Sequence, residues 1–163
     1  MAHWLEQGTI DLGFLEFPYP DHCDCQPILA DEYQLLVPST HDLAVRKQVP
    51  LHQLSGEPFI LSKFGCEPVL RAAFREVNAT MNVTYEVRDL ATLFAMIREG
   101  LGVSMVPELL LTQVPSDLMA IRVTPAVQRE IGLAHPTGTL LSRPVQTLRE
   151  TILKGVPTTG NTA

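Results

Sequence analysis

Apolar residues recur at intervals of three and four positions between residues 89 and 101. This spacing predicts a helix with one apolar face, formed by Leu90, Leu93, Phe94, Ile97 and Leu101. Asp89 suits the N-cap of that helix, and Gly100 stands where a helix ends in the left-handed conformation. Residues 103–106 are too few for a helix and apolar enough for a buried strand, and Pro107 fits the first position of a second helix.

The rest of the chain alternates between strand and helix patterns. Apolar runs and two-residue alternation predict strands at residues 10–15, 27–30, 33–37, 59–62, 83–87, 118–123 and 130–134. Helical spacing predicts helices ending near residue 7, over 67–77 and over 143–154, and the polar tail that follows, 155–163, is expected to be frayed. This order of elements is typical of an α/β fold with mostly parallel sheets. Because open α/β sheets bind ligands where a strand runs directly into a helix, residues 103–108 are a candidate binding segment.

Composition argues against two classes of function, nucleic-acid binding and membrane association. The chain has 163 residues and a formal net charge of −6, and its basic residues are scattered, so a nucleic-acid-binding surface is not expected. Its apolar runs are shorter than the roughly 20 residues needed to cross a bilayer. The N-terminal sequence MAHWLEQG lacks the basic start and apolar core of a signal peptide, and three cysteines, an odd number, suit a reducing compartment. These features predict a cytoplasmic protein without membrane association.

Several short segments carry a resemblance to a known family. They read GTIDLGF at residues 8–14, HDLA at 41–44, LHQLSGEPFI at 51–60, GLGVSMVPE at 100–108 and IGL at 131–133, and residues 142–149 continue the pattern. In this order and spacing they resemble the effector-binding domain of LysR-type transcriptional regulators, over nearly the whole chain. The resemblance implies a type 2 periplasmic-binding-protein-like fold, in which two α/β lobes hold a small molecule in a cleft between them. It implies a sensing domain and not an enzyme, and it implies no cofactor.

The resemblance also implies how the chain is divided. Residues 1–49 and 125–163 would form lobe I, and residues 50–124 would form lobe II. In the family, lobe I opens with a strand, a helix and a second strand, and the intact regulator carries an N-terminal winged helix-turn-helix. This sequence begins after those elements. We therefore expect an incomplete lobe I with an open strand edge, marginal stability, and no DNA contact from the chain itself.

The partners implied by the resemblance are a small-molecule effector, such as a carboxylate, and further copies of the chain. In the family, the first helix of lobe I packs against a lobe II helix of the dimer partner, which corresponds here to residues 67–77. Homo-oligomerisation is therefore expected to be impaired. Effector affinity is expected to be weakened or lost, because the end of the missing first strand commonly supplies a Ser or Thr to the effector.

Three segments are expected to meet at the effector cleft: residues 15–17, 62–67 and 103–108. The backbone amides that follow Gly65 lie at a helix N-terminus, which favours an anion. Ser62 can add a hydroxyl group, and Lys63 can add a positive charge if it is directed inward. The candidate effector-binding residues are Leu15, Glu16, Phe17, Ser62, Lys63, Phe64, Gly65, Cys66, Val103, Ser104 and Val106. Among these, Phe17 and Phe64 would form apolar walls, whereas the Glu16 carboxylate would repel an anion unless a cation pairs with it.

Several alternatives remain open on the sequence. Cys66 lies close to the position of the reactive cysteine in the peroxide-sensing branch of the family, and a helix N-terminus would favour its thiolate. Such a sensor needs a second cysteine soon afterwards, and residues 67–80 contain none. The chain could instead be a fragment of a solute-binding protein, or an enzyme with Cys66 or Ser104 as its nucleophile, although no base stands beside either residue. Residues 22–25, His-Cys-Asp-Cys, are ligand types for a soft metal ion but lack a second nearby pair, so a surface loop without metal is expected.

Overall fold

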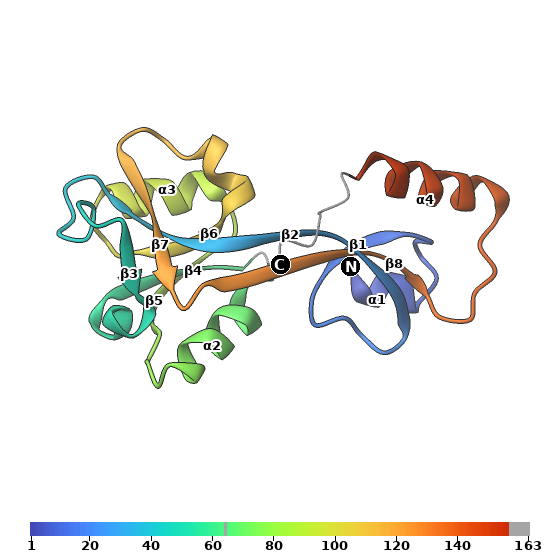
Figure 1. The fold of residues 1–163 in the computed structure, drawn as a ribbon, viewed down its shortest axis with the longest axis horizontal. Helices are drawn as coiled ribbons and strands as arrows, with labels where there is room; N and C mark the ends of the chain where they lie inside the picture. The colour runs from blue at the N-terminus through green and yellow to red at the C-terminus, as the bar shows by residue number, and fades with distance from the viewer. Residues whose placement is uncertain (64, 157–163) are drawn as a thin grey trace. The chain divides into compact units, whose positions relative to one another are not determined.

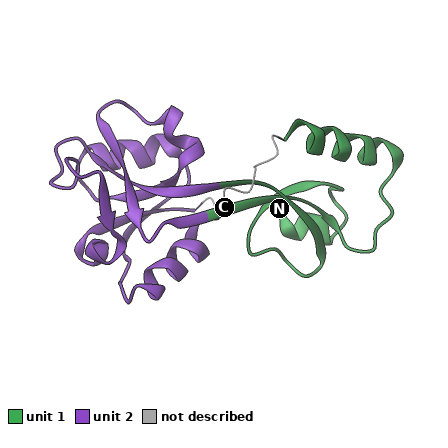
Figure 2. Ribbon diagram, in the orientation of Figure 1, with its two compact units in different colours: residues 1–30, 129–163 green, residues 31–128 purple. Residues whose placement is uncertain are grey.

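The computed structural model describes residues 1–63 and 65–156, and the chain divides into two compact units (Figure 2). Unit 1 contains residues 1–30 together with the chain from 129 onward, and unit 2 contains residues 31–128. Two long strands carry the chain from one unit to the other, β2 (Cys23–Pro38) and β8 (Val127–Pro136) (Figure 1). Because both unit boundaries fall inside these strands, they differ from the expected lobe limits at residues 49 and 125, which stay a prediction.

The long strand β2 replaces two short strands that the sequence predicted on either side of Asp31 and Glu32. Both acidic side chains accept hydrogen bonds. Asp31 Oδ2 accepts one from the amide of Leu109 at 3.1 Å, and Glu32 Oε1 accepts one from Gln128 Nε2 at 2.8 Å. Since the two carboxylates have partners, they interrupt the hydrophobic pattern without ending the strand.

In unit 2, β2 is bordered by two antiparallel strands, β6 (Ser104–Pro107) and β7 (Leu118–Thr124). The short strand β3 (Gln48–Pro50) pairs with β7 in parallel. A separate two-stranded sheet pairs β4 (Pro58–Ser62) with β5 (Asn82–Val87), also in parallel.

The expectation of mostly parallel sheets is therefore wrong. The alternation of strands and helices fixes strand direction only where a helix directly connects two neighbouring strands, as between β4 and β5. It says nothing of strands that are distant in sequence, such as β2 and β7, which are antiparallel.

Helix α3 (Leu90–Arg98) forms as its pattern predicted. The Asp89 side chain accepts a hydrogen bond from the amide of Thr92 at 2.8 Å, and Gly100 follows the helix with φ of 70°. The second helix was predicted to begin at Pro107, but that residue ends β6, and a 3₁₀ helix, η2 (Glu108–Gln113), follows it. No helix in the part of the chain that the structure describes is long and apolar enough to cross a membrane.

The other helices of unit 2 are the 3₁₀ helix η1 (Leu51–Gly56) and α2 (Glu67–Glu76). Helix α2 packs on the larger of two buried apolar clusters in the unit. In that cluster, the rings of Phe59 and Phe74 lie edge to face with 5.9 Å between their centroids. Helix α3 packs on the second cluster through Leu93, Phe94 and Ile97.

Unit 1 contains α1 (Ala2–Glu6), β1 (Gly13–Glu16), part of β2, part of β8 and α4 (Arg143–Gly155). Strand β1 pairs antiparallel with β8 and lies at an edge of its sheet in the part of the chain that the structure describes. Among the described residues of this unit, the buried apolar cluster comprises Leu5, Leu15, Cys23 and Ala134. Helix α4 contributes no buried residue to the unit. Most of the tail that was predicted to be frayed, residues 157–163, lies outside the described residues.

Candidate functional site

The turn between β4 and α2 follows a strand, β4, that makes backbone hydrogen bonds along both of its edges. On one side β4 pairs with β5, with Ser62 opposite Val87. On the other side, the amide of Ile60 donates to the carbonyl of Val103, and the amide of Val103 donates to the carbonyl of Pro58, each at 2.8 Å. The C-terminal end of β4 is thereby fixed, and the chain reaches the first residue of α2, Glu67, within a few residues.

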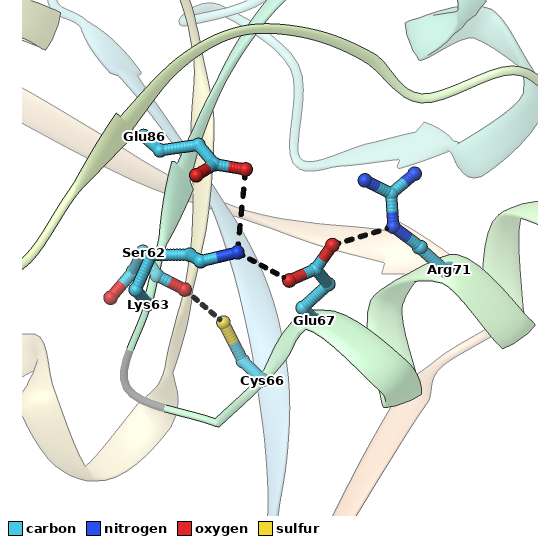
Figure 3. Close-up of polar contacts among 6 residues, drawn as sticks. All are labelled: Ser62, Lys63, Cys66, Glu67, Arg71 and Glu86. Atoms are coloured by element: carbon cyan, nitrogen blue, oxygen red, sulfur yellow. Dashed lines mark hydrogen bonds and ion pairs between the residues drawn. The ribbon is translucent and has the colours of Figure 1, made fainter.

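The turn is closed by a contact between its two ends. The Cys66 thiol donates to the backbone carbonyl of Ser62, with 3.2 Å between sulfur and oxygen (Figure 3). Both residues are buried, and Gly65 between them has φ of 102°, a conformation that other residues rarely adopt. The structure thus brings together three predicted site residues at the N-terminus of α2. Phe64, one of the five predicted residues of this turn, lies outside the described residues.

The Lys63 ammonium lies between two carboxylates (Figure 3). Its Nζ is 2.8 Å from Glu67 Oε2 and 3.3 Å from Glu86 Oε1, while Glu67 Oε1 accepts a hydrogen bond from Arg71 Nε at 2.9 Å. Hydrogen bonds from Lys63 and Arg71 lower the pKa of Glu67, and those to Glu67 and Glu86 raise the pKa of Lys63. Two positive and two negative side chains balance each other here, so Lys63 can serve an anionic effector only by leaving its partners.

This ion-pair network predicts a pH dependence of stability. Because the pKa of Glu67 is lower in the folded protein than in the unfolded chain, its contribution is fully present above the unfolded pKa, near 4.3. That contribution is lost as the pH falls through the folded pKa. We expect Glu67→Gln to lower the melting temperature slightly at pH 7 and the difference from the wild-type protein to shrink below about pH 4.

Thermal melts between pH 3 and pH 7, with and without added salt, measure this effect. Glu76→Gln removes a carboxylate from the last residue of the same helix and is the matched control. If the two variants had equal melting temperatures at every pH, the network would contribute nothing to stability.

The predicted site residues in 103–106 are buried in the core of unit 2. Val103 belongs to the larger apolar cluster and Val106 to the smaller one. The Ser104 side chain is fully buried, and its hydroxyl donates to the carbonyl of Ile60 at 2.7 Å. These residues therefore support β4 from its side, and the Ser104 hydroxyl is committed to a structural hydrogen bond.

The remaining predicted site residues lie in unit 1, at the end of β1. Leu15 is part of the small apolar cluster, and Glu16 is half-buried. Phe17 is 57% exposed and lies edge to face against Tyr19, with 5.6 Å between ring centroids. The predicted site residues therefore form two groups, one in unit 1 and one in unit 2.

Sequence reasoning missed Tyr19 beside this segment. Its hydroxyl donates to Glu130 Oε1 at 3.0 Å, and burial together with this hydrogen bond raises the pKa of Tyr19. Its ring lies so close to Gly132 that a β-carbon there would be 2.7 Å from the tyrosine hydroxyl. The glycine in the IGL segment is the one sequence signal of this close approach.

The possible metal ligands of residues 22–25 do not gather into a site. The expectation of a surface loop here is wrong, because Cys23 and Cys25 lie at the start of strand β2, where Cys23 is buried and Cys25 is half-buried. Burial raises the pKa of both thiols. A raised pKa disfavours the thiolate that binds a metal ion. Within residues 1–63 and 65–156, no group of three or more metal-ligand side chains lies close enough to hold an ion.

The LysR substrate binding domain family model matches residues 1–157, which is nearly the whole chain. The chain belongs to the LysR family. It is 31% identical over 152 residues to an uncharacterised HTH-type transcriptional regulator, YfeR, of Shigella flexneri, with 91% of this chain and 49% of the relative covered. It is also 31% identical over 132 residues to a probable HTH-type transcriptional regulator, LrrA, of Synechococcus elongatus, covering 80% and 44%. These relatives are transcriptional regulators and not enzymes, and this chain spans about half of their length.

Solved effector-binding domains share the fold of this LysR family member. The regulatory domain of Synechocystis CcmR, solved with 2-PG, has a TM-score of 0.86 at 20% identity, with 96% of this chain and 78% of that domain covered. The QuiR domain with shikimate has a TM-score of 0.84 at 18% identity, covering 94% and 75%. The BenM domain with benzoate has a TM-score of 0.78 at 22% identity, covering 94% and 72%. The predicted type 2 periplasmic-binding-protein-like α/β fold is thus confirmed.

Proposed function

We propose that this chain is the sensing part of a LysR-type transcriptional regulator and that it binds a small anionic effector. The turn at residues 62–66 is the observation that supports binding, because it leads from a buried strand to the N-terminus of the ten-residue helix α2. The first turn of a helix presents backbone N–H groups and the positive end of the helix dipole. Shikimate and benzoate, which occupy two of the similar domains, are carboxylates.

The candidate residues take different roles in this proposal. Ser62 and the backbone of Gly65 and Cys66 would bind the anionic group of the effector. Leu15, Glu16 and Phe17 stay a prediction as effector contacts, and residues 103–106 would hold β4 in place from the core. Because the charges around Lys63 balance, selectivity for an anion rests on the helix dipole and on backbone donors.

In the intact regulator, which we propose to be a cytoplasmic homo-oligomer, the effector would shift the protein between conformations that differ in how the oligomer holds DNA. This chain spans 72–78% of the solved domains. We propose that the chain alone binds effector weakly and oligomerises weakly.

The thiol-responsive alternative finds no support in the geometry of Cys66. Its side chain is buried, with an exposed fraction of 6%, and its thiol donates a hydrogen bond to the Ser62 carbonyl. Oxidation of such a thiol is slow because an oxidant has little access to it.

Titrating the ¹⁵N-labelled protein with benzoate and shikimate tests the proposed site. We expect at least one of these carboxylates to shift the backbone amide signals of residues 62–66. Ser62→Ala should weaken that binding about two- to tenfold, as the loss of one hydrogen bond does.

Ser142→Ala removes an exposed serine hydroxyl from unit 1 and serves as the matched control, with unchanged binding expected. If no carboxylate shifted the amides of residues 62–66, or if both variants bound equally well, this turn would not be the effector site.

A further inference from the structure

Two buried polar side chains of unit 2 have no hydrogen-bond partner among the residues that the structure describes. The buried polar residues in that part of the chain are Gln34, Ser62 and Ser104. The Ser104 hydroxyl donates to a backbone carbonyl, as described above. The side chains of Gln34 and Ser62 are each 7% exposed, and neither makes a hydrogen bond to another described residue. Because buried polar groups in folded proteins are mostly hydrogen-bonded, these two exceptions point to a partner from outside the chain.

Strand pairing places Gln34 and Ser62 on the same face of the strands in unit 2. Ser62 of β4 lies opposite Val87, and Gln34 of β2 lies opposite Val106 of β6. Both valines belong to the smaller apolar cluster, on which α3 packs, and residues opposite each other on neighbouring strands share a face. Residue 103, which leads into β6, pairs with β4, so β6 lies between β4 and β2. The two polar residues are therefore two strand spacings apart, roughly 10 Å.

Solvent reaches both polar groups from the ends of their strands. In the part of the chain that the structure describes, Arg149 Nε is the one side-chain polar atom that is both shut off from solvent and without a partner. The Gln34 amide and the Ser62 hydroxyl also lack partners, so both must still be in contact with solvent. Two positions further into the sheet, Leu36 and Ile60 are fully buried. A ligand that lies along the ends of β4 and β6 can therefore reach both groups without entering the core.

The charges near each polar group determine which end of a ligand it suits. Glu32 lies two residues from Gln34 on the same face of β2, and its carboxylate accepts a hydrogen bond from Gln128 Nε2 at 2.8 Å. This carboxylate would repel an anionic group placed beside Gln34. The Gln34 amide can both donate and accept, so it suits a neutral hydroxyl group. Ser62 stands at the turn that leads to the N-terminus of α2, where a carboxylate is favoured.

We propose that Gln34 determines the specificity of the effector site and that the effector is a ring carboxylic acid with a hydroxyl group opposite its carboxylate. This inference rests on the effector site proposed above. The carboxylate binds at Ser62 and the turn after it, and the hydroxyl group binds the Gln34 amide. A six-membered ring with these two groups and a hydrogen bond at each end spans on the order of 10 Å, which matches the separation of the two residues. All of these contacts lie within unit 2.

Nuclear magnetic resonance titration of the ¹⁵N-labelled 163-residue protein with two matched pairs of ligands tests this inference. The pairs are 4-hydroxybenzoate with benzoate, and shikimate with cyclohex-1-ene-1-carboxylate, and the members of each pair differ only in hydroxyl groups. We expect the hydroxylated member to bind about two- to tenfold more tightly and to shift the amide signals of residues 33–35 as well as 62–66. Gln34→Leu keeps a side chain of similar size and should abolish this advantage, while the affinity for benzoate stays unchanged.

Gln113→Leu, which removes an exposed glutamine amide from η2 in the same unit, is the matched control and should retain the preference for 4-hydroxybenzoate. The comparison of ligands on the wild-type protein needs no variant and holds even if Gln34→Leu fails to fold. Benzoate that shifts residues 62–66 without any advantage for the hydroxylated ligands overturns the role of Gln34 and leaves the proposed function standing. Equal losses of benzoate and 4-hydroxybenzoate binding in Gln34→Leu also overturn it, because they indicate a structural role. If no carboxylate shifts residues 62–66, the proposed effector site fails and this inference fails with it.

Discussion

Replacing Phe74 with alanine is expected to lower the free energy of unfolding by about 3–5 kcal/mol, the usual cost of removing a buried aromatic side chain. Phe74 is 2% exposed in the larger apolar cluster of unit 2 and packs edge to face on Phe59. Alanine would leave a cavity between α2 and β4 and would remove the aromatic contact. Urea unfolding followed by circular dichroism measures the loss.

The same substitution at Phe14 is the control for this prediction. Phe14 lies on the edge strand β1 and is 50% exposed, so Phe14→Ala should cost less than about 1 kcal/mol. Similar losses for the two variants would mean that the cluster around Phe74 is not closely packed.

Gly102→Ala is expected to destabilise unit 2 by about 1–3 kcal/mol or more, because the added β-carbon has no room. It would lie 2.5 Å from the carbonyl oxygen of Pro58 and 3.2 Å from the Ile60 side chain. The same carbonyl accepts the hydrogen bond from Val103 that holds β4 at its side, so the clash would disturb the strand that ends at the candidate effector site.

Gly56→Ala is the matched control, since a β-carbon at Gly56 would meet no atom within 4 Å. Urea unfolding of both variants, with the amide signals of residues 62–66 as a local probe, measures the difference. Gly102→Ala with the stability of the wild-type protein would show that β4 and residue 102 are not in close contact.

Helices α2, α3 and α4 and the family were predictable from the sequence, because short-range patterns determine both. The spacing of Leu93, Phe94 and Ile97 predicted α3, and the structure buries all three. Strand direction was not predictable, since nothing local to β2 indicates that it pairs antiparallel with β6 and β7.

The candidate site was predictable only in part, for a similar reason. The glycine and the helix start after residue 62 are local signals, and the structure places both there. The ion pair between Lys63 and Glu86 joins residues that are 23 positions apart, and the hydrogen bond from Ser104 to Ile60 joins residues 44 apart. Contacts of that separation depend on how strands pair, which is why the charge balance at Lys63 and the burial of Ser104 could not be read from the sequence.

The unequal cores of the two units have a consequence for the motions of this protein. Among the described residues, four buried apolar side chains form the cluster of unit 1, which also contains an edge strand and a helix without buried residues. Segments with few buried contacts open at a lower free energy than the rest of a protein, and their amide hydrogens exchange with solvent earlier. Both ends of the chain belong to unit 1, so local unfolding should begin there while the strand-and-helix turn at residues 62–66 still holds its native geometry.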